Sequence, residues 1–202
     1  MILIIIMFIL SYLLGAMVPG FWIGKIFYHK DIRDEGSGNI GTTNSFRVLG
    51  PVPGTITLLL DLLKGTVAGL LPLIFHSNIN PMIIGIAAII GHTFSIWIKF
   101  KGGKAVATSA GVLLAYNPQF FFIIVVVFIL MLLLTSMVSV SSMIGFTVAV
   151  IISFYYKDII LIIVAITLTG FVFYRHRSNI KRILNGTEST IPFGLYYMLH
   201  KK

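Results

Sequence analysis

The sequence contains no cysteine and little charge. Asp, Glu, Lys and Arg together make up 10% of the 202 residues, whereas 57% of the residues are hydrophobic. The absence of cysteine excludes thiol catalysis and leaves the redox compartment undefined. A soluble domain has about 25% charged residues with which to cover its surface. This chain has too few, so lipid must be part of its solvent and we expect an integral membrane protein.

Acidic residues are the scarcest charged class, with six Asp and Glu against 15 Lys and Arg and a formal net charge of +9. An excess of Lys and Arg is typical of the cytoplasmic loops of membrane proteins. No aromatic residues alternate with the basic ones to form a nucleic-acid groove, so nucleic acid is not an expected partner. No carboxylate cluster predicts a metal site, and no motif calls for a cofactor.

Long apolar runs predict an all-α bundle of membrane helices, because backbone groups in lipid must pair internally. Most of the basic residues form three blocks, near 29–47, 99–104 and 175–182, and Lys25, Lys64 and Lys157 are among those that lie outside them. Blocks that face one side are separated by an even number of spans, which favours seven helices over the main alternative of five. The N-terminus is then outside, the C-terminus is cytoplasmic, and residues 1–202 form one domain. The expected helices cover residues 2–24, 54–75, 81–98, 105–115, 119–134, 142–155 and 159–173.

The first basic block contains the stretch DIRDEGSGNIGTTNSFRVLG at 31–50. Glycine lets the backbone approach a ligand closely, successive N–H groups form anion-binding turns, and arginine binds phosphate oxygens in a two-pronged manner. The block is therefore interpreted as a phosphate-binding loop, with an ordinary turn carrying helix-capping Ser and Thr as the alternative. Its glycine spacing also matches a dinucleotide fingerprint, but no strand precedes it. The candidate ligands are Ser37, Gly38, Asn39, Gly41, Thr43, Asn44 and Arg47.

The second block, KFKGGKAVATSAG at 99–111, places two glycines between lysines. The glycine turn is predicted to lead into a helix, whose N-terminal N–H groups and partial positive charge favour phosphate. The alternative is a set of lysines that extend to the membrane surface, which we prefer for Lys99. The candidate phosphate-binding residues are Lys101, Gly102, Gly103, Lys104 and Thr108.

The third block, YRHRSNIKRILNGTE at 174–188, is predicted to be helical, with His176 and Asn179 on one face. These two residues are interpreted as site residues, and the arginines as contacts to lipid headgroups. Ser142 lies near the expected start of the sixth helix and faces the same side. Asp61 and Lys64 are charged residues inside the second span, and the choice between a functional role and a mutual ion pair stays open.

Three stretches in this order and spacing, GSGNIGTTNSFRVLG, GHTFSIWIKFKGGKAVATSAG and RHRSNIKRILNGTE, carry a resemblance to a known family. They closely resemble the signature motifs of the bacterial acyl-phosphate-dependent glycerol-3-phosphate acyltransferases, the PlsY family. The resemblance covers the whole chain and includes DLLKG at 61–65. Two departures are Ala105 and Thr42, where the family usually has Gly and Ala.

The resemblance implies a seven-helix enzyme of the bacterial cytoplasmic (inner) membrane, with its active site facing the cytoplasm. Its substrates would be acyl phosphate and glycerol 3-phosphate, and membrane lipid would surround it. The sequence leaves the oligomeric state open, with a monomer as one option. A direct acyl transfer is favoured, because no nucleophile with a readable base and orienting acid is present. The residues expected to take part in catalysis are His176, Asn179, Ser142 and Lys104.

Two other functions are alternatives to this hypothesis. A phosphate- or lipid-handling membrane transporter predicts ionisable residues through the membrane midplane and often an internal repeat, and the sequence shows no convincing repeat. The pattern of His29 followed by Asp34 resembles the catalytic signature of a different group of acyltransferases, which use acyl-CoA or acyl carrier protein. Such a short pattern arises easily by chance, and we interpret it as coincidence.

Overall fold

A computed structural model describes residues 1–200, and within this range the chain is helical with no strand. Two compact units follow each other along the chain, Met1–Pro118 and Gln119–Lys202. The predicted all-α class and the membrane character are confirmed by the helices and by their apolar lengths. A single domain over residues 1–202 stays a prediction.

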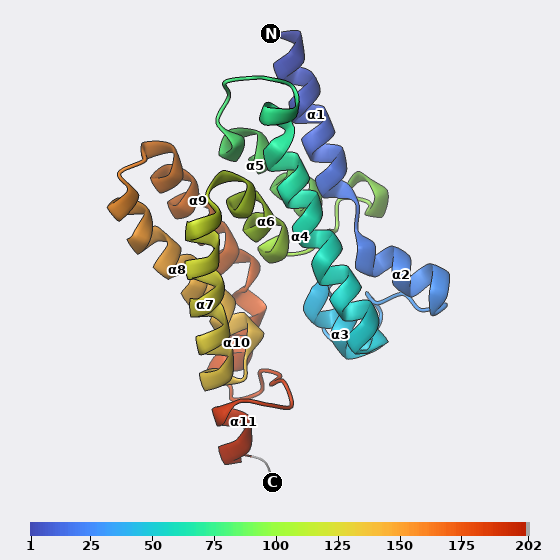
Figure 1. The fold of residues 1–202 in the computed structure, drawn as a ribbon. Coiled ribbons are helices and arrows are strands. Elements are labelled where there is room, and N and C mark those ends of the chain that lie inside the picture. The colour runs from blue at the N-terminus through green and yellow to red at the C-terminus, as the bar shows by residue number, and fades with distance from the viewer. Residues whose placement is uncertain (201–202) are drawn as a thin grey trace. The chain divides into compact units, whose positions relative to one another are not determined.

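The N-terminal unit is built around one long central helix. In Figure 1 this helix, α4, runs between α1 and α6, with which it is in contact, and α1 also packs along α5. The elements of this unit are α1 (Ile2–Ala16), α2 (Pro19–Phe27), α3 (Thr42–Leu49), α4 (Pro51–Ile74), α5 (Pro81–Thr93), the 3₁₀ helix η1 (Ile96–Ile98) and α6 (Val106–Tyr116).

The C-terminal unit contains three long helices and two short ones, and α8 packs along α9. Its elements are α7 (Pro118–Thr135), α8 (Val138–Tyr156), α9 (Ile159–Arg175), α10 (Arg177–Leu184) and α11 (Leu195–His200). The side chain of Ser136, between α7 and α8, accepts a hydrogen bond from the Tyr197 N–H at 3.0 Å. This bond holds α11 at the junction of α7 and α8.

The helix ends follow signals that are visible in the sequence. Proline occupies the first turn of α2, α4 and α5. Backbone N–H groups in the first turn have no acceptor within the helix, so proline, which lacks an N–H, costs no hydrogen bond there. The Asn80 side chain caps α5 by accepting from the Met82 N–H at 2.8 Å. The Asp158 carboxylate caps α9 by accepting from the Ile160 and Leu161 N–H groups.

Each of the seven expected apolar runs is helical, but not all of them are long enough to span a membrane. Four helices, counting α5 together with η1 as one, are long and apolar enough to cross alone, and the number rises to six if two bent helix pairs each form one span. The 18 residues of α7 extend about 27 Å, close to the thickness of a bilayer core. The 11 residues of α6 extend only about 16 Å. The fourth expected span is therefore too short to cross as a helix alone.

The first expected span, over residues 2–24, is interrupted in the structure. α1 ends at Ala16 and α2 begins at Pro19, with a bend of 44° between them. A proline disfavours the helical conformation of the residue before it, and Val18 accordingly has φ −121° and ψ 80°. The expectation of one continuous helix was wrong because it ignored this proline.

Small residues let the helices of the N-terminal unit approach closely. A Cβ on Gly65 would collide with the backbone oxygen of Thr108, and one on Gly111 would collide with the oxygen of Leu62. These contacts bring α4 and α6 together.

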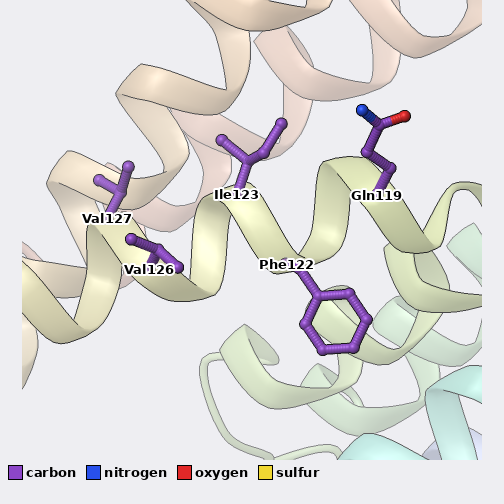
Figure 2. A pocket seen from close by; sticks show the side chains of 5 residues that line it. All are labelled: Gln119, Phe122, Ile123, Val126 and Val127. Carbon is purple, nitrogen blue, oxygen red and sulfur yellow. The ribbon is translucent and has the colours of Figure 1, made fainter.

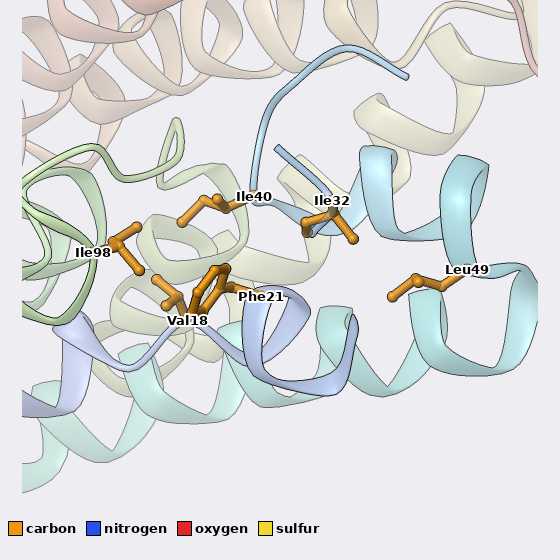
Figure 3. Packing of buried hydrophobic residues seen from close by; sticks show 6 residues of the cluster. All are labelled: Val18, Phe21, Ile32, Ile40, Leu49 and Ile98. Atoms are coloured by element: carbon orange, nitrogen blue, oxygen red, sulfur yellow. The ribbon is translucent and has the colours of Figure 1, made fainter. Parts of the chain in front are cut away.

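An apolar cluster joins the first two basic blocks (Figure 3). Ile32 and Ile40, from the loop before α3, pack in one buried cluster with Ile98, the residue directly before the second block. The other members of this cluster are Val18, Phe21 and Leu49. The two blocks therefore lie on the same side of the N-terminal unit, as expected for two intervening spans.

Candidate active site

Asn44 organises the loop that precedes α3. Its Nδ2 donates to the Ile32 oxygen at 2.7 Å and to the Glu35 oxygen at 3.1 Å, and its Oδ1 accepts from the Ser37 N–H at 2.8 Å. The residue is 1% exposed. Both amide hydrogens and the oxygen therefore have partners within the loop, and a direct contact from Asn44 to phosphate stays a prediction. Asn44 fixes the shape of the loop.

The other candidates of the first block lie nearer the surface. Arg47, Ser37, Gly38 and Thr43 are exposed, and Gly38 has φ +69°, a conformation that favours glycine. The Asn39 side chain accepts from the Gly41 N–H at 3.0 Å, which closes a tight turn. This loop presents a cation and small polar groups on a rigid backbone.

His29 and Asp34 are exposed. The ion pairs of their segment join Lys30 to Glu35 at 3.2 Å and Arg33 to Asp31 at 2.6 Å. The hydrogen bonds from Arg33 lower the pKa of the Asp31 carboxyl more than burial raises it, so this pKa lies below its ordinary value. The charges next to the His29–Asp34 pattern thus form local pairs of their own.

The two glycines of the second block hold their loop against α5. The Gly102 N–H donates to the Thr93 oxygen at 2.9 Å, and the Gly103 N–H donates to the His92 oxygen at 3.1 Å. A Cβ on Gly102 would collide with these same carbonyls. Both N–H groups are thus used within the fold, and phosphate binding by Gly102 and Gly103 stays a prediction. The paired glycines permit close contact with the end of α5.

The lysines of this loop remain candidates for phosphate contact. Lys101 is exposed and Lys104 is half-buried, just before the start of α6. Ala105 has φ 57°, in the left-handed region, where a residue with a Cβ costs about 1–2 kcal/mol. This conformation gives a physical reason for the glycine expected there from the resemblance.

Thr108 is fully buried, and its predicted contact with phosphate stays a prediction. Its hydroxyl lies 3.3 Å from Nδ1 of His92. Lys64 Nζ lies 2.7 Å from the same nitrogen and 2.7 Å from Oδ1 of Asp61. The ion pair between Asp61 and Lys64 is thereby confirmed as buried. The contact between this ion pair and His92 was not predicted from the sequence. The sequence shows His92 only as a polar residue within an apolar run.

His176 lies where α9 ends and α10 begins, and the two helices are bent by 59° at this point. It is 2% exposed, and its Nδ1 lies 2.8 Å from the Val172 oxygen. A carbonyl only accepts, so Nδ1 carries the hydrogen in the neutral ring and Nε2 is the basic nitrogen. His176 and Asn179 both lie in this region, at the junction and on α10 respectively.

Glu188 is a residue that the sequence reasoning missed. Its carboxylate accepts from Asn179 Nδ2 at 2.6 Å, from Ser139 Oγ at 2.7 Å and from Arg182 Nε at 2.7 Å. Burial raises the pKa of Glu188, but these three hydrogen bonds together outweigh it and hold the pKa below its ordinary value. Arg182 therefore pairs with a carboxylate, which corrects its assignment to lipid headgroups. The one feature of the sequence that could have indicated Glu188 is that it is a single acidic residue at the end of a basic block.

Ser142, the remaining catalytic candidate, lies on α8 one turn after Ser139. It is 4% exposed, and its hydroxyl donates to the Val138 oxygen at 2.8 Å. Ser139, Asn179 and Arg182 converge on Glu188, so α8 and α10 are joined through this carboxylate. Of the candidate residues of the C-terminal unit, Asn179 belongs to this polar network, whereas Ser142 and His176 bond to carbonyls of the preceding turn.

A groove on α7 has a different character. Figure 2 shows its lining side chains, which project from one helix and are apolar except for the amide of the first. A surface of this kind suits hydrocarbon and offers nothing to a phosphate group. The lining residues are Gln119, Phe122, Ile123, Val126 and Val127.

The fold and its loops define a polytopic helical membrane protein with cationic, glycine-containing polar loops. Residues 5–186 match the model of the family described as glycerol-3-phosphate acyltransferase. The chain belongs to this family.

The similarity to known proteins extends over nearly the whole chain. The glycerol-3-phosphate acyltransferase of Lactiplantibacillus plantarum is 60% identical over 195 residues, which cover 95% of this chain and 94% of that protein. The one from Enterococcus faecalis is 52% identical, covering 95% of this chain and 94% of the relative. The crystal structure of PlsY, an integral membrane glycerol 3-phosphate acyltransferase, in its glycerol 3-phosphate form has a TM-score of 0.88, at 32% identity over 98% of each chain. The lysophosphatidic acid form of PlsY has a TM-score of 0.84 at 31% identity, over 93% of this chain and 95% of that one.

Proposed function

We propose that this protein transfers a fatty acyl group from acyl phosphate to the 1-hydroxyl of glycerol 3-phosphate. The products are 1-acylglycerol 3-phosphate (lysophosphatidic acid) and inorganic phosphate, and the reaction begins phospholipid synthesis. Membership of the acyltransferase family supports the acceptor and the reaction class. The acyl-phosphate donor rests on the resemblance of the three motifs and on the chemistry of the loops.

The observation that carries the proposal is the placement of cations in the N-terminal unit. Arg47 is exposed beside the loop that Asn44 organises, and Lys101 and Lys104 follow on the second loop. The shared apolar cluster places both loops on one side of this unit. Both substrates carry phosphate, so two cationic loops on one side match two anionic groups. We assign Arg47, Ser37 and Asn39 to one phosphate and Lys101 and Lys104 to the other.

The reaction requires little more than positioning and charge neutralisation, because acyl phosphate is an activated mixed anhydride. The 1-hydroxyl oxygen attacks the acyl carbonyl carbon, and the bond from that carbon to the phosphate oxygen breaks. The electron pair leaves with phosphate, and Lys104 neutralises its charge. Ser142, His176 and Asn179 of the C-terminal unit serve the same reaction by orienting the substrates.

The attacking hydroxyl must lose its proton, and we assign that proton to an oxygen of the leaving phosphate. His176→Gln tests this, because glutamine can form hydrogen bonds but cannot accept a proton at neutral pH. We expect kcat to fall less than about tenfold, since general bases contribute about 10²–10⁴-fold. A larger loss of kcat with unchanged KM values would instead make Nε2 of His176 the base. Steady-state kinetics with both substrates varied give the measurement.

The orientation follows from the positive-inside rule. The basic blocks mark cytoplasmic loops, which places the N-terminus outside, the C-terminus inside and the site on the cytoplasmic side of the bacterial inner membrane. Cysteine-labelling is well suited to this chain because it has no native cysteine. Single cysteines at Lys101 and Thr187 should both react with an impermeant reagent from the cytoplasmic side only.

The function itself is tested with purified protein in detergent. Phosphate release should require acyl phosphate and glycerol 3-phosphate together, and lysophosphatidic acid should form in equal amount. Release without the acceptor would indicate a hydrolase. Substrate movement across proteoliposomes without any product would support the transporter alternative.

A further inference from the structure

The N-terminal unit contains a buried charged cluster that the proposed reaction does not use. Asp61 and Lys64 lie on α4 and His92 lies on α5, and their side chains are 3–5% exposed. Charged residues inside a membrane helix bundle are costly and generally mark a function. The cluster lies next to the second loop, because the His92 oxygen accepts from the Gly103 N–H.

Three acceptor atoms lie close to the Lys64 ammonium. Nζ lies 2.5 Å from the Met17 oxygen, 2.7 Å from Oδ1 of Asp61 and 2.7 Å from Nδ1 of His92. The Met17 carbonyl is exposed to this contact because the helix breaks between α1 and α2. An ammonium only donates, so Nδ1 of His92 must accept.

This contact determines where the neutral His92 ring carries its hydrogen. Asp61 Oδ1 also approaches Nδ1, but at 3.4 Å, so the shorter contact from Lys64 decides. With Nδ1 as acceptor, the hydrogen is on Nε2. A Cβ built on Gly103 would collide with Nε2. The ring therefore presents its N–H side to the loop that carries Lys101 and Lys104.

We propose that Asp61 and Lys64 are positioning residues, which fix His92 as a neutral Nε2–H donor against the loop of residues 101–104 and thereby set its affinity for phosphate. The inference rests on the proposed function, in which this loop binds a substrate phosphate. Asp61 holds Lys64 charged, Lys64 fixes the tautomer, and the imidazole supports the loop at Gly103. None of the three is required to touch the substrate.

The test separates positioning from simple folding. Removing one charge leaves the other buried and unpaired, so Asp61→Asn and Lys64→Met should each lower thermal stability strongly. The double variant D61N/K64M removes both charges and should recover much of that stability. Its KM for one phosphate-bearing substrate should still rise about tenfold, the cost of one lost hydrogen bond near a charged group, with kcat within about threefold.

A second pair of variants tests the same idea without the ion pair. His92→Gln can present an N–H near the position of Nε2, whereas His92→Leu cannot. We expect KM to stay within about threefold of wild type for H92Q and to rise about tenfold for H92L. Thr57→Val is the control, because Thr57 is equally buried on α4 and its hydroxyl donates to the Pro53 oxygen, outside the cluster.

Wild-type KM values in folded D61N/K64M, or H92Q as impaired as H92L, would overturn the proposal. If the double variant does not fold, the His92 pair decides alone. If the wild-type protein itself shows no acyl transfer, the proposed function is wrong. That result is distinct from a failure of the positioning role, which is judged only by comparing variants with an active wild type.

Discussion

Replacing Glu188 by alanine is expected to abolish most activity and to destabilise the C-terminal unit. Ser139, Asn179 and Arg182 all lose the same acceptor, and the loss of an acceptor for a buried donor such as the Ser139 hydroxyl costs about 1–3 kcal/mol. Asn179 is a proposed site residue, and a shift of about 1 Å can reduce a rate by about 10²-fold. We therefore expect kcat/KM to fall at least about 100-fold, with an earlier thermal transition in detergent.

Glu35→Ala is the matched control for this substitution. Glu35 pairs with Lys30 at 3.2 Å, but both side chains are nearly half-exposed. Exposed pairs contribute at most about 1 kcal/mol, so E35A should unfold close to the wild-type temperature. If E188A behaved like E35A in both measurements, the proposed role of the Glu188 carboxylate in holding α8 and α10 would be wrong.

The pH dependence of stability gives a second measure of Glu188. Its pKa is lowered below the ordinary value of 4.5, because its hydrogen bonds outweigh the cost of burial. A carboxylate with a lowered pKa stabilises the fold above its unfolded-state pKa, and that stabilisation is lost as the pH falls through the folded-state pKa. Wild-type protein should therefore lose stability below about pH 4.5, and Glu188→Gln should lack this step.

The sequence predicts the helical architecture well where the signals are local. The structure ends helices at Tyr116, Thr135 and Tyr156, and each of these residues is followed in the sequence by turn residues or a proline. The pairing of Asp61 with Lys64 could also be predicted, because three residues along a helix brings two side chains together. Signals of this kind act within one or two turns of chain.

The roles of individual site residues were harder to predict, because they depend on partners far along the chain. Asn44 and Gly102 are residue types that often bind phosphate. In the structure, however, the Asn44 side-chain amide donates to the Ile32 oxygen and the Gly102 N–H donates to the Thr93 oxygen. Nothing in the sequence states that Lys64 reaches His92, 28 residues away. A polar residue in a glycine-rich loop can bind a ligand or bind the loop itself, and only the three-dimensional partners distinguish the two.

Replacing Lys104 by methionine should have the largest effect of any single change in the second loop. Methionine keeps the length and the apolar part of the side chain, so the change removes the ammonium alone. In the proposed reaction this cation neutralises the phosphate that leaves, and loss of one such group costs about 10²–10³-fold in kcat. Arginine should restore part of the rate, because it keeps the charge but differs in geometry. Single-turnover measurements at saturating substrate isolate the chemical step.

Lys99 provides the comparison within the same loop. It is exposed, it lies five residues before Lys104, and it was interpreted from the sequence as a lysine that extends to the membrane surface. Lys99→Met also lowers the net charge by one, so a general electrostatic effect on anionic substrates would change both variants alike. A specific role requires K104M to be slow while K99M stays near the wild-type rate. Equal rates for the two would mean that the cations of this loop act only through their summed charge, and the assignment of Lys104 to the leaving phosphate would then be withdrawn.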